Sequence, residues 1–381
     1  MTSIAPLLLI LATLTTQLSS GINYVTIPIA MVHQGYGNTE IGVAMAFEIL
    51  GVFLLYRPLS HYIAKCGLLS SYIVLTLVRI GSLLLLSHSR VYGLWILGIF
   101  SYGLANGMIL VMTQTWLNIL AQGKWKGLFM GLFSSALSCG VALGPIVLQL
   151  SIFQIGATFE LNAALTLVPL LIIVGCPRAG NSGNQVGAVR FRFALRHAKV
   201  VLISAFIGGI GFFGLPSFLT LYGMDQGLTE PQAQLLLTMF MFGSVSLGML
   251  LSTCASFVQR STIALAGVFC SVVCAVYLSL AVDAQYWVAL IFLFIWGGSM
   301  GGIYAIGLTT IGERFCPQDQ MTANMSYSLM DSLGGMIGLL VIGRMFDVFG
   351  PEGMTFVFVV GGCSLLIIFV YALLSDEKTF E

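Results

Sequence analysis

Charged side chains are scarce in this sequence. Asp, Glu, Lys and Arg make up 8% of its 381 residues, apolar residues make up 58%, and the formal net charge is +1. A soluble globular domain carries about 25% charged residues, so the composition excludes an ordinary soluble protein. A bilayer offers no hydrogen-bond partners to the backbone, and membrane-spanning segments must therefore be helices or closed barrels. The apolar runs are long and unbroken, which favours helices.

Motifs for ATP use and metal binding are also missing. The sequence has no Walker A motif, so direct drive by ATP is unsupported. Its four histidines form no HExxH motif and no ligand cluster. Cys270 and Cys274 are spaced i, i+4 in an apolar run without a His or an acid, and we interpret them as core residues. We therefore expect no metal site and no cofactor.

A motif associated with catalysis does occur at residues 297–301, where Gly-Gly-Ser-Met-Gly matches the G-x-S-x-G pattern of serine hydrolases. That pattern needs a preceding strand, whereas Ser299 stands inside a long apolar run. Glycines at this spacing let two membrane helices approach closely. We interpret Ser299 as part of a helix face and expect that the protein is not an enzyme.

Apolar runs long enough to span a bilayer predict an all-α membrane protein with twelve transmembrane helices. The first run is longer than the core of a signal peptide, and no Lys or Arg precedes Arg57, so we expect a retained helix. The predicted spans are 4–32, 40–58, 69–87, 92–120, 127–152, 157–176, 199–222, 231–255, 262–282, 285–311, 321–343 and 354–374.

Basic residues predict the orientation of these spans, because cytoplasmic loops retain Lys and Arg. With the N-terminus inside, only Arg90 and Arg344 fall in outer loops, and Arg79 falls within a span. We expect a multi-pass protein of the bacterial cytoplasmic (inner) membrane with both termini in the cytoplasm. The basic residues then assigned to the cytoplasmic side are Arg57, Lys65, Lys124, Lys126, Arg178, Arg190, Arg192, Arg196, Lys199, Arg260, Arg314 and Lys378.

Short motifs recur in the same order at a separation of about 190–195 residues, which indicates an internal repeat. We therefore predict two parallel six-helix halves, residues 1–176 and 199–381, joined by a basic cytoplasmic linker at 177–198. The matched pairs are GNTE at 37–40 with GLTE at 227–230, Gly103-x3-Gly107 with Gly298-x3-Gly302, and Gly140-x3-Gly144 with Gly334-x3-Gly338.

Twelve spans in two parallel halves with a basic middle loop resemble the major facilitator superfamily. In the fifth span, Gly131-x8-Gly140-x3-Gly144-Pro145 matches the family's antiporter motif, with Leu148-Gln149 in place of its closing glycines. The run from "YAIGLTTIGERF" to "GRMFDVFGPEG" is similar to a bacterial branch of YcaD-type transporters. The loop at 60–69 lacks the family's usual acid, and Ile99 stands where the fourth span usually carries an Arg.

The resemblance implies alternating access by two halves, with spans 1, 4, 7 and 10 lining a central cavity. These spans offer amides and aromatic rings but no Lys or Arg, which suits a neutral or cationic organic solute better than a polyanion. Some of these residues are equally suited to bonding helices together. The candidate cavity residues are Gln17, Asn23, Tyr24, Asn106, Gln114, Asn118, Phe212, Phe213, Trp296 and Tyr304.

Three charged residues inside spans are candidates for proton coupling. Glu48 and Arg79 fall at a similar depth on consecutive spans, so we predict a buried ion pair between them. Asp331 stands in the eleventh span with no basic residue nearer than Arg344, and we predict that it binds and releases a proton. It shares a helix face that we expect to meet the opposite half, made up of Asn324, Tyr327, Asp331, Gly334 and Gly338.

Together these features predict a secondary active transporter of a small organic solute that works by alternating access, with proton-coupled export favoured. A proton-coupled nutrient uptake symporter is the alternative, because export and uptake share a fold. A transport-inactive membrane sensor or assembly partner is the alternative from another class. We expect the partners to be the solute, protons and the lipid bilayer, with no nucleic acid, and we expect a monomer.

Overall fold

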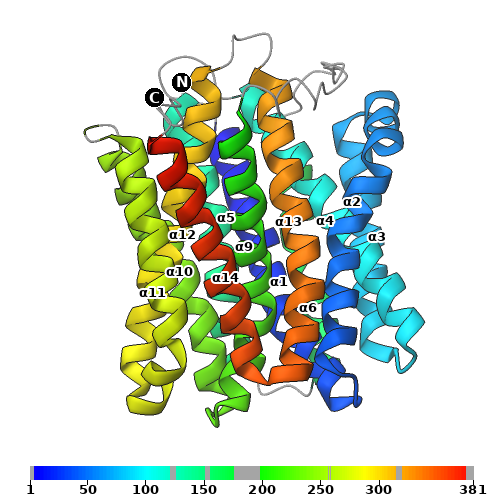
Figure 1. Cartoon of the computed structure of the whole chain (residues 1–381). Coiled ribbons are helices and arrows are strands. Elements are labelled where there is room, and N and C mark those ends of the chain that lie inside the picture. Colours follow the sequence, from blue (N-terminus) through cyan, green and yellow to red (C-terminus); the bar gives the residue numbers. More distant parts are fainter. Residues whose placement is uncertain are drawn as a thin grey trace. The chain divides into compact units, whose positions relative to one another are not determined.

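The computed structural model describes residues 4–120, 126–150, 155–175, 198–255, 257, 259–314 and 320–374 (Figure 1). Twelve helical segments among these residues are long and apolar enough to cross a membrane, which confirms the predicted twelve spans. The helices are α1 (Ala5–His33), α2 (Asn38–Cys66), α3 (Leu68–His88), α4 (Tyr92–Leu120), α5 (Lys126–Leu150), α6 (Ile155–Leu165), α7 (Leu167–Val174), α9 (Lys199–Asp225), α10 (Glu230–Cys254), α11 (Arg260–Ala284), α12 (Tyr286–Arg314), α13 (Gln320–Phe349) and α14 (Pro351–Leu374).

Two helices differ from the predicted spans in a way that local chemistry explains. The predicted span 157–176 is divided into α6 and α7 at Thr166. Pro169 lies three residues later, and a proline ring has no N–H to donate to the preceding turn, so a regular helix is interrupted there. Helix α13 continues to Phe349, six residues past the predicted 343, and ends at Gly350, whose φ of 68° suits a glycine that closes a helix.

The chain divides into two compact units. Unit 1 comprises Met1–Gly35 with Ala44–Val186, and unit 2 comprises Tyr36–Val43 with Gly187–Glu381. The beginning of α2 therefore packs with unit 2, while the rest of α2 packs with unit 1. Residues 177–197 of the predicted linker lie outside the described residues, so the predicted linker and the boundaries of the two halves stay predictions.

Close backbone contacts between α1 and α5 organise unit 1. Gly140 and Gly144 of α5 lie against the backbone of α1, where a Cβ atom would overlap Leu14 or Gly21. Pro145 is buried beside them within α5. Gly131 has no neighbour within 4 Å of the place a Cβ would take. Within the antiporter-like motif, Gly140 and Gly144 therefore allow the close crossing of α1 and α5, whereas Gly131 takes no part in it.

The same device recurs in unit 2, where α13 packs along α9 (Figure 1). Gly334 and Gly338 lie against the backbone of α9 at Phe206 and Ile210, with no room for a Cβ at Gly334. The other glycine pair repeats as well, because the α4 pair packs on α2 within unit 1 and the α12 pair packs on α10. The repeated glycines therefore hold equivalent helix pairs together in the two units.

Ser299 lies within the unbroken helix α12, as the sequence predicted. Its hydroxyl donates to the carbonyl of Ile295 at 3.0 Å, four residues earlier in the same helix. Gly297 and Gly301 of the same helix pack against α10, where they contact the backbone of Phe240 and Ser244. The G-x-S-x-G match is thus a helix-packing motif, and it forms no strand–turn–helix elbow.

Candidate functional site

Arg79 of α3 is fully buried in unit 1. Its Nη2 donates to the carbonyl oxygen of Thr16 at 2.9 Å and to the hydroxyl of Tyr102 at 3.0 Å. The guanidinium also lies over the Tyr102 ring, 5.0 Å from its centroid. A buried cation needs such partners because the bilayer supplies none. Arg79 therefore ties α3 to α1 and α4.

Predicted cavity residues extend this cluster. The hydroxyl of Ser20 lies 3.2 Å from that of Tyr102, and it can donate to the amide oxygen of either Gln17 or Asn106, at 3.3 and 3.4 Å. We call the whole group the Arg79 network. Its members are Thr16, Gln17, Ser20, Arg79, Tyr102 and Asn106.

The predicted ion pair between Glu48 and Arg79 is wrong. Both residues are described, and no ion pair forms between them in the structure. The two are close enough for an electrostatic interaction, as expected for residues at a similar depth on consecutive spans. The guanidinium is instead oriented towards α1 and α4, because a carbonyl and a hydroxyl there offer hydrogen bonds. Glu48 is half-buried, and its backbone packs on Gly103 of α4.

The remaining candidates in unit 1 have separate environments. Asn23 accepts a hydrogen bond from the side-chain amide of Asn162 at 2.7 Å and is buried. Tyr24 is half-buried, whereas Gln114 is exposed. The side chain of Asn118 lies outside the described residues. The structure therefore places Gln17 and Asn106 in one network and does not add Asn23 or Gln114 to it.

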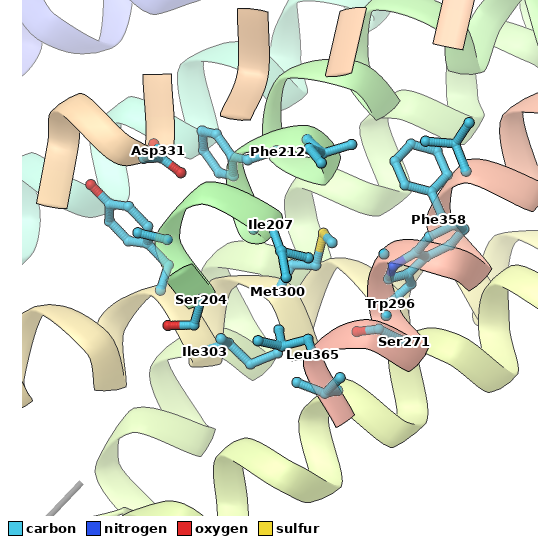
Figure 2. A pocket seen from close by; sticks show the side chains of 18 of the residues that line it. Ser204, Ile207, Phe212, Ser271, Trp296, Met300, Ile303, Asp331, Phe358 and Leu365 are labelled. Carbon is cyan, nitrogen blue, oxygen red and sulfur yellow. The ribbon is translucent and has the colours of Figure 1, made fainter. Parts of the chain in front are cut away.

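Asp331 lines a pocket within unit 2, which we call the Asp331 pocket (Figure 2). The residue is 7% exposed, and its carboxylate has neither a hydrogen bond nor an ion pair with any described residue. The helix face that carries Asp331 packs on α9 of the same unit. The sequence predicted instead that this face meets the opposite half. The side chain of Asn324 on that face lies outside the described residues.

Aromatic rings surround this acid. Phe212 of α9 and Tyr304 of α12 are stacked with centroids 6.0 Å apart, and Tyr327 of α13 meets Tyr304 edge-on at 5.4 Å. Both tyrosines are close enough to Asp331 for an electrostatic interaction. Phe213 contacts Phe212 edge-on at 5.8 Å and packs on α13, so it supports the wall without lining the pocket.

The other end of the Asp331 pocket is apolar (Figure 2). Trp296 of α12 is buried there and meets Phe358 of α14 edge-on at 5.4 Å. Its indole Nε1 has no hydrogen-bond partner among the described residues. The sequence indicated Phe212, Trp296, Tyr304 and Asp331 but missed the lining residues of α11 and α14, because spans 9 and 12 were not expected to line a cavity. The missed residues of these two helices include Val268, Ser271, Phe358 and Gly361. Ser204 of α9 and Met300 of α12, on spans that were expected to line the cavity, also line the pocket.

A second acid on α13 has the opposite environment. The carboxylate of Asp347 accepts hydrogen bonds from the backbone N–H groups of Asn38 and Thr39 at 2.9 and 2.7 Å, and from the Thr39 hydroxyl at 2.5 Å. These donors form the first turn of α2, whose helix dipole favours a negative charge. Asp347 therefore anchors the start of α2 to α13 within unit 2. No local sequence pattern predicts this contact between residues more than 300 positions apart.

Comparison with known proteins agrees with this architecture. Among solved structures, the chain is similar to the nucleoside transporter NupG (TM-score 0.81, 13% identity, covering 98% of this chain and 99% of that one) and to a D-xylose–proton symporter (0.78, 11%, 96% and 96%). It is also similar to a bacterial homologue of the human lysosomal transporter Spinster in an inward-facing, unoccupied conformation (0.71, 14%, 99% and 97%).

At these identities the likeness shows the fold alone. No curated protein matches the sequence. The YcaD-type resemblance stays a prediction. The sequence model of the Major Facilitator Superfamily matches residues 9–315 and 201–380, which together span nearly the whole chain. The protein therefore belongs to the Major Facilitator Superfamily.

Proposed function

We propose that the protein is a secondary active transporter that moves a small organic solute by alternating access and couples this movement to protons at Asp331. The observation that carries the proposal is a buried carboxylate with no hydrogen bond or counter-ion among the described residues, set in a pocket. An ionised carboxylate in such surroundings is costly. A proton removes that cost when the site is closed to water and leaves when water returns.

The lining of the Asp331 pocket supports a solute that is neutral or cationic. No Lys, Arg or His is among the residues that line it, so a polyanion has no fixed counter-charge there. Aromatic faces of Phe212, Tyr304 and Trp296 suit the body of an organic molecule. The absence of basic side chains from this pocket matches the absence noted for spans 7 and 10 of the sequence.

Export is the direction we favour, because Gly131-x8-Gly140-x3-Gly144-Pro145 resembles the family's antiporter motif. Uptake is the second candidate, and the symporter among the similar folds makes it worth testing. The two differ only in whether solute and proton cross in opposite directions or the same one.

The first experiment identifies a solute by its effect on the melting temperature of the purified protein, since a ligand of the folded state raises apparent stability. The solute found is then used in proteoliposomes with an imposed pH gradient. The Asp331→Asn variant is expected to lose gradient-driven accumulation and to keep counterflow exchange when the solute is supplied at saturating concentration. Glu160→Gln, which neutralises an exposed acid on α6, is the matched control and is expected to keep both activities.

Full gradient-driven accumulation by Asp331→Asn would remove Asp331 from the coupling mechanism. The direction of the imposed pH gradient decides between the two. Solute that accumulates in the more acidic compartment indicates proton exchange and export, and solute that accumulates in the less acidic compartment indicates symport and uptake. Absence of any solute-dependent flux in the unmodified protein, despite binding, would favour the transport-inactive sensor or assembly partner.

We also propose that both termini lie in the cytoplasm and that the membrane is the bacterial inner membrane, on the basis of the twelve-to-two distribution of Lys and Arg. A cysteine introduced as Gln185→Cys in the region between the two predicted halves is expected to react with a membrane-impermeant thiol reagent only in inside-out vesicles. Reaction of this cysteine in intact cells would show that the region lies outside and would overturn the proposed orientation.

A further inference from the structure

The Asp331 pocket combines one carboxylate with several aromatic faces, and we propose that it binds an organic ammonium group directly at Asp331. The solute cation and the proton are then alternative occupants of one acid. This inference rests on the proposed function, because it names the chemical class of the transported solute. It also assigns the coupling of solute and proton to a single side chain.

Charge balance is the first reason. Asp331 is the single Asp or Glu among the pocket residues, and no Lys, Arg or His lines the pocket to offset it. The carboxylate also forms no hydrogen bond with the neighbouring hydroxyls of Ser204, Tyr304 or Tyr327, all of which are described residues. A single positive charge that enters the pocket therefore neutralises an otherwise unpaired buried acid, which a neutral solute does not do.

Aromatic faces are the second reason. Phe212, Tyr304 and Tyr327 form a continuous set of rings beside the acid, with neighbouring centroids 5.4 and 6.0 Å apart. Electron-rich ring faces attract an ammonium group held within about 6 Å. Trp296, the ring type with the strongest such attraction, stands at the far end of the same pocket. Carboxylate and rings together suit an ammonium group attached to an apolar body.

An inorganic cation fits the same pocket less well. Hard metal ions such as Ca²⁺ take about six to eight oxygen ligands, whereas most residues of this pocket are aliphatic or aromatic. The hydroxyls of Ser204 and Ser271 already donate to backbone carbonyls of their own helices at 2.7 and 2.9 Å. One carboxylate and a few hydroxyls do not form a complete shell of oxygen ligands. The pocket therefore favours a weakly hydrated organic cation.

The size of the pocket and a second polar group in it narrow the chemical class of the solute further. The pocket encloses about 50 Å³, enough for an ammonium group or a few waters. A larger body is accommodated when side chains move, and Met300 in the wall is flexible enough to do so. Trp296 Nε1 is a buried donor with no partner among the described residues. An acceptor atom at the far end of the solute would satisfy that donor.

Competition with protons follows from the shared acid. Within unit 2, the titratable groups beside Asp331 are Tyr304 of α12 and Tyr327 of α13, while α9, α11 and α14 contribute no titratable side chain to the pocket. The two tyrosines stay protonated over the working range of pH. A change in cation affinity with pH is therefore assigned to Asp331. Affinity is expected to fall as pH falls, by up to about tenfold per unit once the acid is mostly protonated.

The experiment measures binding to the full-length protein in detergent, without a gradient, by calorimetry. Three probes of matched shape differ in charge: 2-phenylethylamine, a cation over about pH 5–8, 2-phenylethanol, which is neutral, and 3-phenylpropanoate, an anion. The unmodified protein is expected to prefer the amine to the alcohol by at least about tenfold, since bonds to charged groups are the stronger ones. The anion is expected not to bind.

Variants then test the two parts of the pocket. Asp331→Asn is expected to abolish the preference for the amine over the alcohol, and Tyr304→Leu is expected to weaken amine binding about two- to thirtyfold. If Asp331 or Tyr304 had a purely structural role, its substitution would weaken binding of the amine and of the alcohol equally. The ratio of these two affinities is therefore the deciding quantity. If Asp331→Asn does not fold, the fall in amine affinity with pH in the unmodified protein decides instead.

Equal binding of amine and alcohol, or amine binding that does not change with pH, would overturn this inference. Neither result depends on a gradient. Failure of the proposed function appears elsewhere, as gradient-driven accumulation by Asp331→Asn in proteoliposomes. The cation site and the coupling role are therefore judged by separate measurements.

Discussion

Arg79 in unit 1 and Asp331 in unit 2 are both buried ionisable residues inside membrane spans, yet their surroundings differ. Arg79 donates to two oxygens and lies over a ring. Asp331 has no hydrogen bond among the described residues and lines a pocket. A buried charge that already has hydrogen-bond partners ties helices together, whereas a buried charge without partners costs stability and is available to bind a ligand. The contrast assigns a structural role to Arg79 and a binding role to Asp331.

The largest expected effect on stability comes from Arg79→Ala. The change removes two hydrogen bonds and a large buried side chain, and we expect a loss of about 2–5 kcal/mol, as for other large-to-small buried substitutions. The melting temperature of purified protein measures it. Arg90→Ala, at an exposed position in the loop after α3, serves as the control. A melting temperature equal to that of the unmodified protein would show that Arg79 is not structural.

A smaller loss is expected for Tyr102→Phe, which keeps the ring under Arg79 and removes the hydroxyl. That hydroxyl accepts from the guanidinium at 3.0 Å and lies 3.2 Å from Ser20. We expect a cost of about 1.5–3 kcal/mol, the range for hydrogen bonds to charged groups. Comparing its melting temperature with that of Arg79→Ala separates the hydrogen bond from the ring contact. A loss as large as that of Arg79→Ala would assign the whole effect to the hydroxyl.

Asp347→Ala tests the acid on α13 that does have partners. It removes three hydrogen bonds at the first turn of α2, and we expect a loss of about 1 kcal/mol, as for other helix caps. Glu352→Ala, an exposed acid at the start of α14, is the matched control. Thermal unfolding of the two variants side by side measures the difference. No difference between them would mean that solvent replaces the cap without cost.

The smallest change is expected for Asp331→Leu, which fills the pocket with an apolar side chain of similar size. Removing a buried acid without partners is expected to leave the melting temperature unchanged or to raise it, within about 1 kcal/mol. The same variant is expected to lose amine binding. A loss of stability comparable to that of Arg79→Ala would show that Asp331 has a structural role after all, and the contrast between the two residues would fail.

The spans and the closely packed glycines were predictable from the sequence because each depends on a local pattern. Apolar runs fix where a helix crosses, and the spacing of Gly334 and Gly338 marks a close contact even before its partner helix is known. Asp331 was indicated because an acid with no base nearby is unusual within a span. These signals are carried by composition and helical period, which any reader of the sequence can measure.

The errors and omissions concern which way a side chain points and what lies across from it. A depth estimate brought Glu48 and Arg79 to the same level, but depth does not show that the guanidinium reaches Thr16 and Tyr102. The bond between Asp347 and the start of α2 joins residues about 300 positions apart, and neither residue is unusual in its local sequence. Such contacts depend on how helices pack, which periodicity alone does not determine.

Gly209 of α9 lies against the main-chain carbonyl of Asp331 itself, with no space for a Cβ between them. At that level the two helices touch backbone to backbone, so any shift of α13 relative to α9 has to carry main chain past main chain. Without such a shift, Asp331 moves by turning about its own side-chain bonds, over the reach of one short carboxylate. Water or solute then has to reach the acid at the place where α9 and α13 hold it.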